Sequence, residues 1–240
     1  MKLDLMVIAA HPDDAELACS GTIMSHIAKG KKVGIVDLTR GELGTRGTAE
    51  SRKNEAIEAS KIMGISVREN LAFADGFFQN DKKHQLELVK VIRKYQPDIV
   101  LANTLEDRHP DHARAAQLAY DACFYSGLKK IETKVKDEVQ EHWRPNRIFH
   151  YIQSNYIKPD FVVDITEFWD KKVEAVKAFK TQFHTGEGES GENQTFISTP
   201  TFMRFLESRA REYGQHVGVE FAEGFKTAKP LAVNDLYHFI

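Results

Sequence analysis

Residues 5–10 (LMVIAA) form a short apolar run that stops at the polar stretch HPDD, residues 11–14, and a helical pattern then extends over residues 15–28. A continuous apolar run of this length is typical of a strand that is covered on both faces of a sheet. Gly30 ends the helical pattern, and a second apolar run occupies residues 33–38. The start of the chain therefore predicts a strand, a helix and a second strand, in that order.

The same alternation continues through the first half of the chain. Further helices are predicted at residues 50–63, 85–94 and 111–125, and further strands at residues 70–73 and 98–102. Strands that alternate with helices indicate βαβ units on a mostly parallel sheet with right-handed crossovers. We therefore predict one Rossmann-like α/β domain over residues 1–240, with helices flanking the sheet, because 240 residues are too few for two independent cores.

The second half of the chain is less regular. We expect a charged, solvated excursion at residues 131–144, strands at residues 147–153 and 160–165, and a helix with Thr166 as its N-cap. Residues 184–200, rich in Gly, Glu, Ser and Thr, are predicted to be a mobile loop that could serve as a lid. A last helix is predicted at residues 201–213.

Composition excludes several classes of function. Hydrophobic residues make up 42% of the chain and charged residues 28%, and the formal net charge is −2. Without a basic excess, neither a nucleic acid nor an anionic membrane is expected as a partner. No apolar run is long enough to cross a membrane. The two cysteines, Cys19 and Cys123, form no C-x-x-C motif, so we expect buried free thiols in a cytoplasmic protein.

Two polar segments, HPDD at residues 11–14 and HPDH at residues 109–112, each follow a predicted strand. Functional groups of parallel sheets gather beyond the carboxyl ends of the strands, so the two segments are expected to meet at one edge. Asp13 or Asp14 alone could simply cap a helix. Together the segments supply two histidines and a carboxylate, the ligand set of many catalytic zinc sites, with a carboxylate and an imidazole left for proton transfer. Which of Asp13 and Asp14 would bind the metal stays open from the residues.

The sequence HPDDAE at residues 11–16, taken with HPDH at residues 109–112, resembles the LmbE-like, or PIG-L, deacetylases. The members of this family are zinc enzymes that remove acetyl groups from N-acetylglucosamine conjugates. The segments at residues 37–42 (DLTRGE), 44–52 and 218–223 (GVEFAE) resemble the branch that acts on N-acetylglucosaminyl malate in bacillithiol biosynthesis. The resemblance covers nearly the whole chain.

Carried over by position, the resemblance implies that His11, Asp14 and His112 are the zinc ligands. Asp13 would be the general base that takes a proton from the attacking water. A site of two histidines and one carboxylate can also hold Fe²⁺.

The resemblance further implies that His109 stabilises the oxyanion and that Asp111 holds His109 in place. Arg52 would bind the substrate, since its planar fork suits a carboxylate such as that of malate. An arginine on an exposed helix face is the alternative reading of Arg52.

The expected partner is a small glycoconjugate, and a homo-oligomer is expected from the resemblance. Three other functions are open: deacetylation of another N-acetyl sugar conjugate, a catalytically silent sugar-binding module of the same fold, and a nucleotide-binding oxidoreductase. The oxidoreductase is disfavoured because the chain has no G-x-G-x-x-G fingerprint between a strand and a helix.

Overall fold

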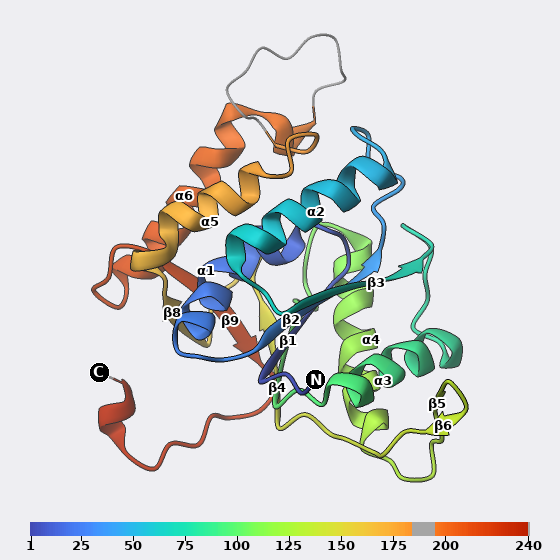
Figure 1. The fold of residues 1–240 in the computed structure, drawn as a ribbon. Coiled ribbons are helices and arrows are strands. Elements are labelled where there is room, and N and C mark those ends of the chain that lie inside the picture. The colour runs from blue at the N-terminus through green and yellow to red at the C-terminus, as the bar shows by residue number, and fades with distance from the viewer. Residues whose placement is uncertain (184–194, 240) are drawn as a thin grey trace.

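The computed structural model describes residues 1–183 and 195–239, and most of its strands belong to one seven-stranded sheet (Figure 1). The strands of this sheet are β1 (Leu5–Ala9), β2 (Val33–Thr39), β3 (Val67–Phe73), β4 (Ile99–Asn103), β7 (Arg147–Tyr151), β8 (Phe161–Asp164) and β9 (Ala222–Thr227). Their order across the sheet is β3-β2-β1-β4-β7-β9-β8. A separate hairpin is formed by β5 (Lys134–Val135) and β6 (Glu138–Val139).

The first five strands across the sheet are parallel, and β9 pairs antiparallel with both β7 and β8. This arrangement confirms the predicted α/β domain with a mostly parallel sheet. The chain runs outward from β1 to β2 and β3 on one side, and then crosses to β4 on the other side. The strand order thus reverses between β1 and β4, which is the place where open α/β sheets form their ligand sites.

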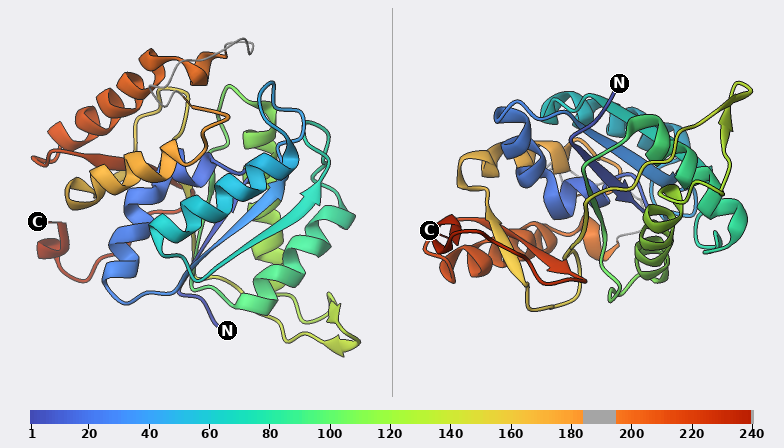
Figure 2. Two further views of the ribbon diagram at one scale, coloured as in Figure 1. Left: turned by 45° about the horizontal axis from the view of Figure 1, so that its top comes forward. Right: turned by 90° about the horizontal axis from the view of Figure 1, so that it is seen from below.

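Helices cover both faces of the sheet (Figures 1 and 2). One face carries α1 (Asp14–Ala28), α2 (Ala49–Met63), α5 (Trp169–Lys177) and α6 (Pro200–Gln215), and the other carries α3 (Lys82–Tyr95) and α4 (Pro110–Ser126). Strand β1 shows why both faces are apolar, because Leu5 and Val7 join the first core while Met6 and Ile8 join the second. The continuous apolar run of residues 5–10 is therefore the mark of a strand buried on both faces.

The structure corrects two details of the prediction. Thr166 is not the N-cap of α5: it begins a 3-10 helix (Thr166–Phe168), its N–H is accepted by Asp164, and α5 starts only at Trp169. Of the predicted loop at residues 184–200, residues 184–194 lie outside the described residues. The rest is not an open loop, since Phe196–Ser198 forms a 3-10 helix and Pro200 begins α6.

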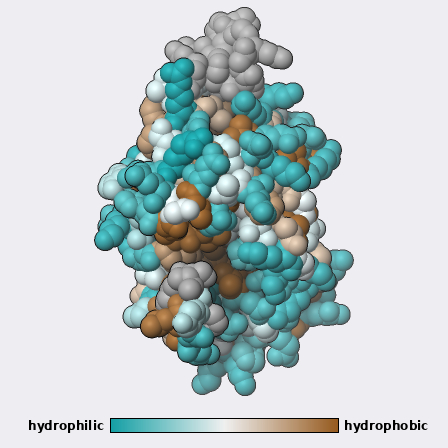
Figure 3. Space-filling view, turned by 90° about the vertical axis from the view of Figure 1, so that its left-hand side faces the viewer, coloured by the Kyte–Doolittle hydropathy of each residue, from teal (hydrophilic) through white to brown (hydrophobic). Residues whose placement is uncertain are grey.

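Two surface features complete the fold. The face on the side of α6 and the C-terminal segment is mostly hydrophilic, with apolar side chains gathered in a hollow near its middle (Figure 3). The hairpin of β5 and β6 is exposed, as expected for the charged excursion at residues 131–144. Within the described ranges, no helix combines the length and the apolar character that crossing a membrane requires.

Candidate metal centre

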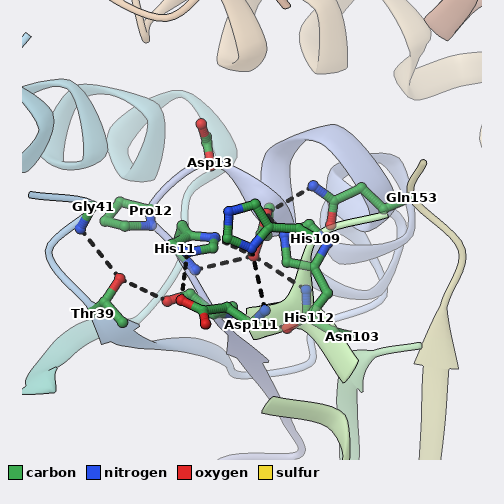
Figure 4. Close-up of polar contacts among 12 residues, drawn as sticks. His11, Pro12, Asp13, Thr39, Gly41, Asn103, His109, Asp111, His112 and Gln153 are labelled. Atoms are coloured by element: carbon green, nitrogen blue, oxygen red, sulfur yellow. Dashed lines mark hydrogen bonds and ion pairs between the residues drawn. The ribbon is translucent and has the colours of Figure 1, made fainter. Parts of the chain in front are cut away.

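The two polar segments meet at the carboxyl ends of β1 and β4, which are neighbours in the sheet. His11 follows β1, and Asp14 begins α1; His109 caps α4, and Pro110 begins that helix. The three imidazoles of His11, His109 and His112 lie together, with ring centroids 4.7–5.5 Å apart (Figure 4). They line a cavity of about 320 Å³ together with Asp13 and Asp14.

The carboxylate of Asp14 lies between two imidazoles. Its Oδ1 is 3.2 Å from Nε2 of His112, and its Oδ2 is 3.6 Å from Nδ1 of His11. Ligand atoms roughly 2.0–2.1 Å from a tetrahedral zinc ion are about 3.3 Å apart. Each separation is close to that value, with a different oxygen of Asp14 facing each histidine. The structure thus brings the three predicted ligands together, and all three side chains are buried.

Carboxylates lie beside the far nitrogens of His11 and His112, and the contact at His112 is an ion-pair distance without hydrogen-bond geometry. Nε2 of His11 is 3.1 Å from Asp75 and 3.3 Å from Asp111, and Nδ1 of His112 is 3.3 Å from Asp107. Although burial opposes it, Asp14 and Asp107 raise the pKa of His112 to about 9, and Asp111, Asp14 and Asp75 raise that of His11 well above its ordinary value, so both rings are cations beside Asp14. A bound metal ion would replace the protons that face Asp14 and leave each ring neutral, with its remaining proton towards Asp75, Asp111 or Asp107.

Amide side chains hold Asp14 in the same way. Asn103 donates to Oδ2 (3.1 Å) and Gln153 donates to Oδ1 (2.7 Å). Asn103 also accepts the N–H of Ala10 at 3.0 Å, so it ties the end of β4 to the segment that follows β1. Although burial opposes the charged form, the neighbouring His112 and His11 hold the pKa of Asp14 well below its ordinary value. The Asp14 carboxylate is therefore ionised, and the ionised form is the one that binds a metal ion.

Among the residues that the structure describes, two groups of side chains offer three ligand atoms that all lie within 4.8 Å of one another: His11, His109 and His112, and His11, Asp75 and Asp111. The predicted set of His11, Asp14 and His112 is not one of these groups, and Asp14 turns a different oxygen to each of its two histidines. The second group uses the nitrogen of His11 that the carboxylates already occupy. The first group is a genuine alternative to the predicted set, and replacing Asp14 or His109 distinguishes them.

Asp13 points away from the imidazoles (Figure 4). Its Oδ2 forms an ion pair with Nη2 of Arg52 at 2.8 Å, and both side chains are buried. Its backbone has a φ of 129°, an uncommon value for a residue with a side chain, and this turn separates the directions of Asp13 and Asp14. Burial raises the pKa of Asp13 to about 7, against the lowering effect of Arg52.

Arg52 is thus not an arginine on an exposed helix face. Besides Asp13, it donates to the backbone oxygen of Pro12 and to Oε1 of Gln182 (3.2 Å). It also lines the cavity. Contact with a substrate stays a prediction, and the observed partners belong to the protein itself.

His109 and Asp111 are close, but not through the predicted contact. The backbone N–H of Asp111, and not its carboxylate, donates to Nδ1 of His109 at 3.2 Å. The carboxylate of Asp111 instead contacts His11, accepts the N–H of Gly76 at 2.8 Å and pairs with Arg114. Because Nδ1 of His109 accepts a hydrogen bond, the proton of its neutral ring is on Nε2. His109 is thereby a hydrogen-bond donor in a half-buried position on the cavity wall.

Sequence reasoning missed Asp75, Asn103, Asp107 and Gln153. Each follows or ends a strand at the carboxyl edge of the sheet: β3, β4 and β7 precede them. Polar residues just beyond predicted strands could have been collected as candidates on that ground. Their partners could not be assigned, because the contacts join residues up to 139 positions apart in the chain.

Comparison with known proteins shows a family model and several relatives to which this chain is similar. A family model described as GlcNAc-PI de-N-acetylase, PIG-L, matches residues 6–123, which include both polar segments. The chain is 30% identical over 253 residues to a 4-oxalmesaconate hydratase of Pseudomonas putida, covering 96% of this chain and 91% of the relative. It is 28% identical over 236 residues to a diacetylchitobiose deacetylase of Thermococcus kodakarensis, covering 92% of this chain and 82% of the relative.

The bacillithiol branch is a more distant match. A probable N-acetyl-alpha-D-glucosaminyl L-malate deacetylase 2 of Bacillus subtilis is 29% identical over 199 residues, covering 76% of this chain and 84% of the relative. Among solved structures, a conserved protein of Thermus thermophilus superposes with a TM-score of 0.86 at 37% identity, covering 98% of both chains. From the matching motifs, the near-complete alignments and the shared fold, the chain belongs to the PIG-L, or LmbE-like, family.

Proposed function

We propose that this protein is a metal-dependent hydrolase that removes the N-acetyl group of an N-acetylglucosaminyl conjugate, with His11, Asp14 and His112 as the metal ligands. The observation that carries the proposal is the position of the Asp14 carboxylate between two imidazoles whose far nitrogens face carboxylates. Two imidazoles and one carboxylate suit zinc, and the same donors also bind iron. When bound, the ion would supply Lewis-acid activation of the acetyl carbonyl and of water.

We assign proton transfer, oxyanion stabilisation and positioning to the remaining residues Asp13, His109 and Asp111. Asp13, held by Arg52 on one oxygen, is the proposed base that takes a proton from the attacking water. The Nε2–H of the neutral His109 ring is the proposed hydrogen-bond donor to the oxyanion, and the proton that Asp13 takes from water is the one passed on to the leaving amine. Asp111 serves as a positioning residue, because its backbone N–H holds Nδ1 of His109 and its carboxylate holds His11.

The proposed substrate is N-acetylglucosaminyl malate. The segments at residues 37–42, 44–52 and 218–223 support this branch, as does the similarity to the Bacillus subtilis relative. The predicted role of Arg52 in binding the substrate belongs to this proposal, as do a cytoplasmic location and a homo-oligomeric state. The buried free thiols of Cys19 and Cys123 suit the reducing cytoplasm.

The test measures acetate release from N-acetylglucosaminyl malate and from N-acetylglucosamine, with zinc-loaded and chelator-stripped protein. We expect metal-dependent turnover of the conjugate and much weaker turnover of the plain sugar. Metal-dependent turnover of neither compound would reject the substrate, and equal activity with and without metal would reject the mechanism.

A second candidate is the hydration of an unsaturated carboxylic acid, in which water adds across a carbon–carbon double bond. The 30% identity to a hydratase over almost the whole chain favours it. A separate assay with a conjugated unsaturated acid tests this candidate, because hydration bleaches the ultraviolet absorbance of that acid and releases no acetate.

A further inference from the structure

Three arginines line the cavity of the metal centre, and they differ in what engages each guanidinium. Arg52 is held by Asp13 and by neighbouring oxygens. Arg108 is exposed to water and lies over the ring of Phe196, 5.7 Å from its centroid. Arg209 lies over the ring of Phe205, 5.5 Å from its centroid. Its buried Nη1 meets no hydrogen-bond partner among the residues that the structure describes, and no carboxylate in those ranges forms an ion pair with it.

The position of Arg209 on its helix explains the burial. Helix α6 turns an apolar stripe towards the sheet, made of Phe202, Leu206, Ala210 and Tyr213. Arg209 lies within this stripe, one turn after Leu206 and one turn before Tyr213. Tyr213 packs so closely on Gly224 of β9 that a Cβ added there would be 2.7 Å from the ring, and this contact holds the helix against the sheet.

The two carboxylates whose charges act on Arg209, Glu223 and Asp107, are already occupied. Glu223 pairs with Lys172 at 2.6 Å and accepts two backbone N–H groups, from Gly21 and Thr22. Asp107 faces His112 and accepts the N–H of Ser154. Burial therefore lowers the pKa of Arg209 even though Tyr213 and these two carboxylates oppose the shift.

A guanidinium that is partly buried without an ion-pair partner lowers the stability of the folded protein. Buried polar groups without partners are rare in native proteins, and one that lines a cavity of about 320 Å³ indicates a ligand that completes it. The planar fork of arginine matches a carboxylate or a phosphate. Arg52 has its own anion in Asp13, and Arg108 is exposed to water. Among the described residues that line this cavity, Arg209 is therefore the arginine that combines a buried guanidinium nitrogen with the lack of an anion.

We propose that Arg209 is an anion-recognition residue, which binds a carboxylate or phosphate group carried by the part of the substrate beyond its reacting end. The cavity then selects acidic conjugates over neutral ones. The inference rests on the proposed function for the identity of the reacting acetamide, while the anion site itself requires only the cavity and Arg209.

The kinetic test compares Arg209→Gln with the wild-type holoenzyme on three substrates: N-acetylglucosaminyl malate, N-acetylglucosamine 1-phosphate and the neutral methyl N-acetylglucosaminide. We expect Arg209→Gln to lower kcat/KM about 10- to 100-fold on the anionic substrate that the enzyme prefers, and about twofold or less on the neutral one. Whichever anionic substrate is affected identifies the group as carboxylate or phosphate. Equal losses on all three substrates would overturn the proposal.

Matched variants separate anion binding from a structural effect. Arg211→Gln changes an exposed arginine two positions along the same helix, paired with Glu207 and Glu220, and is expected to leave all three substrates unaffected. Arg209→Lys keeps the charge but loses the planar fork, and is expected to lower kcat/KM more on the anionic substrate than on the neutral one. If Arg209→Gln fails to fold, equal losses on both substrates in Arg209→Lys contradict the proposal.

A binding measurement keeps this inference separate from the proposed reaction. Calorimetric titration of the holoenzyme with L-malate and with inorganic phosphate is expected to show binding that weakens about 10-fold or more in Arg209→Gln. Coordination of an anion to the metal alone would survive this substitution. If no substrate is deacetylated but anion binding depends on Arg209, the proposed function fails and the anion site stands. Unchanged binding of both anions in Arg209→Gln overturns the anion site.

Discussion

The Asp13 carboxylate and the Arg52 guanidinium are 2.8 Å apart in a buried ion pair. The pair joins the segment after β1 to helix α2, and Arg52 adds hydrogen bonds to Pro12 and Gln182. Gly41 makes room for it: with a φ of 66° it passes so close that an added Cβ would be 2.8 Å from Nη1 of Arg52. An arginine that the sequence suggests for the substrate therefore also orients the proposed base.

Replacing Arg52 distinguishes these two duties. Because the guanidinium holds Asp13, we expect Arg52→Gln to lower kcat by roughly 10- to 100-fold, the usual cost of losing a partner that orients a catalytic group. A residue that only bound substrate would instead raise KM. Steady-state kinetics make the comparison, with Lys53→Gln, an exposed neighbour on the same helix, as the control. An unchanged kcat with a raised KM would show that holding Asp13 is unimportant.

Helix α1 depends on a second buried ion pair. Nζ of Lys172 pairs with Glu223 and donates to the backbone oxygens of Glu16 and Leu17, close to the kink of α1 at Cys19. Removing one partner of a buried pair leaves a charge uncompensated, so Lys172→Met is expected to lower the free energy of unfolding by about 3–5 kcal/mol.

Urea unfolding measures this loss. Lys171→Met, at an exposed position next to it, serves as the control and is expected to change stability by less than about 0.5 kcal/mol. If the two variants were equally stable, the ion pair would contribute nothing to the fold.

Much of the fold could be predicted because a parallel strand that is buried on both faces consists of consecutive apolar residues. Residues 5–10, 33–38 and 98–102 all became central strands of the sheet. Strand β9 could not be found in this way, because its sequence AEGFKT carries Glu223 facing inward to Lys172. A charged residue at a buried strand position breaks the expected pattern, and its partner is 51 residues away.

The candidate site, like the fold, could be predicted from the sequence only in part. The proximity of residues 11–14 and 109–112 followed from the sheet, since both segments end neighbouring parallel strands. The partner of Asp111 did not follow, because a carboxylate beside two histidines can face either, and packing of the β3 loop, with Asp75 and Gly76, decides that it faces His11. Local spacing predicts which segments meet, and only the packed structure fixes which atoms touch.

Both cysteines are expected to be unreactive in the native protein. Cys19 and Cys123 are buried, and burial raises the pKa of the Cys123 thiol to about 12 and that of Cys19 well above its ordinary value. The thiolate is the reactive form, so at about pH 8 a disulfide reagent should modify neither residue until denaturant is added. Rapid modification of the native protein would mean that one of the two thiols opens to solvent.

Metal content of two single variants tests the central claim most directly. Asp14→Ala and His109→Ala are purified beside the wild type, checked by circular dichroism for folding, and analysed for bound zinc and for acetate release. The wild type is expected to hold about one zinc ion per chain. Asp14→Ala is expected to lose both the metal and the activity, whereas His109→Ala is expected to keep the metal and to lose activity by roughly 100-fold or more. Zinc that stays in Asp14→Ala and is lost from His109→Ala would assign the ion to the three imidazoles and contradict the ligand set of His11, Asp14 and His112.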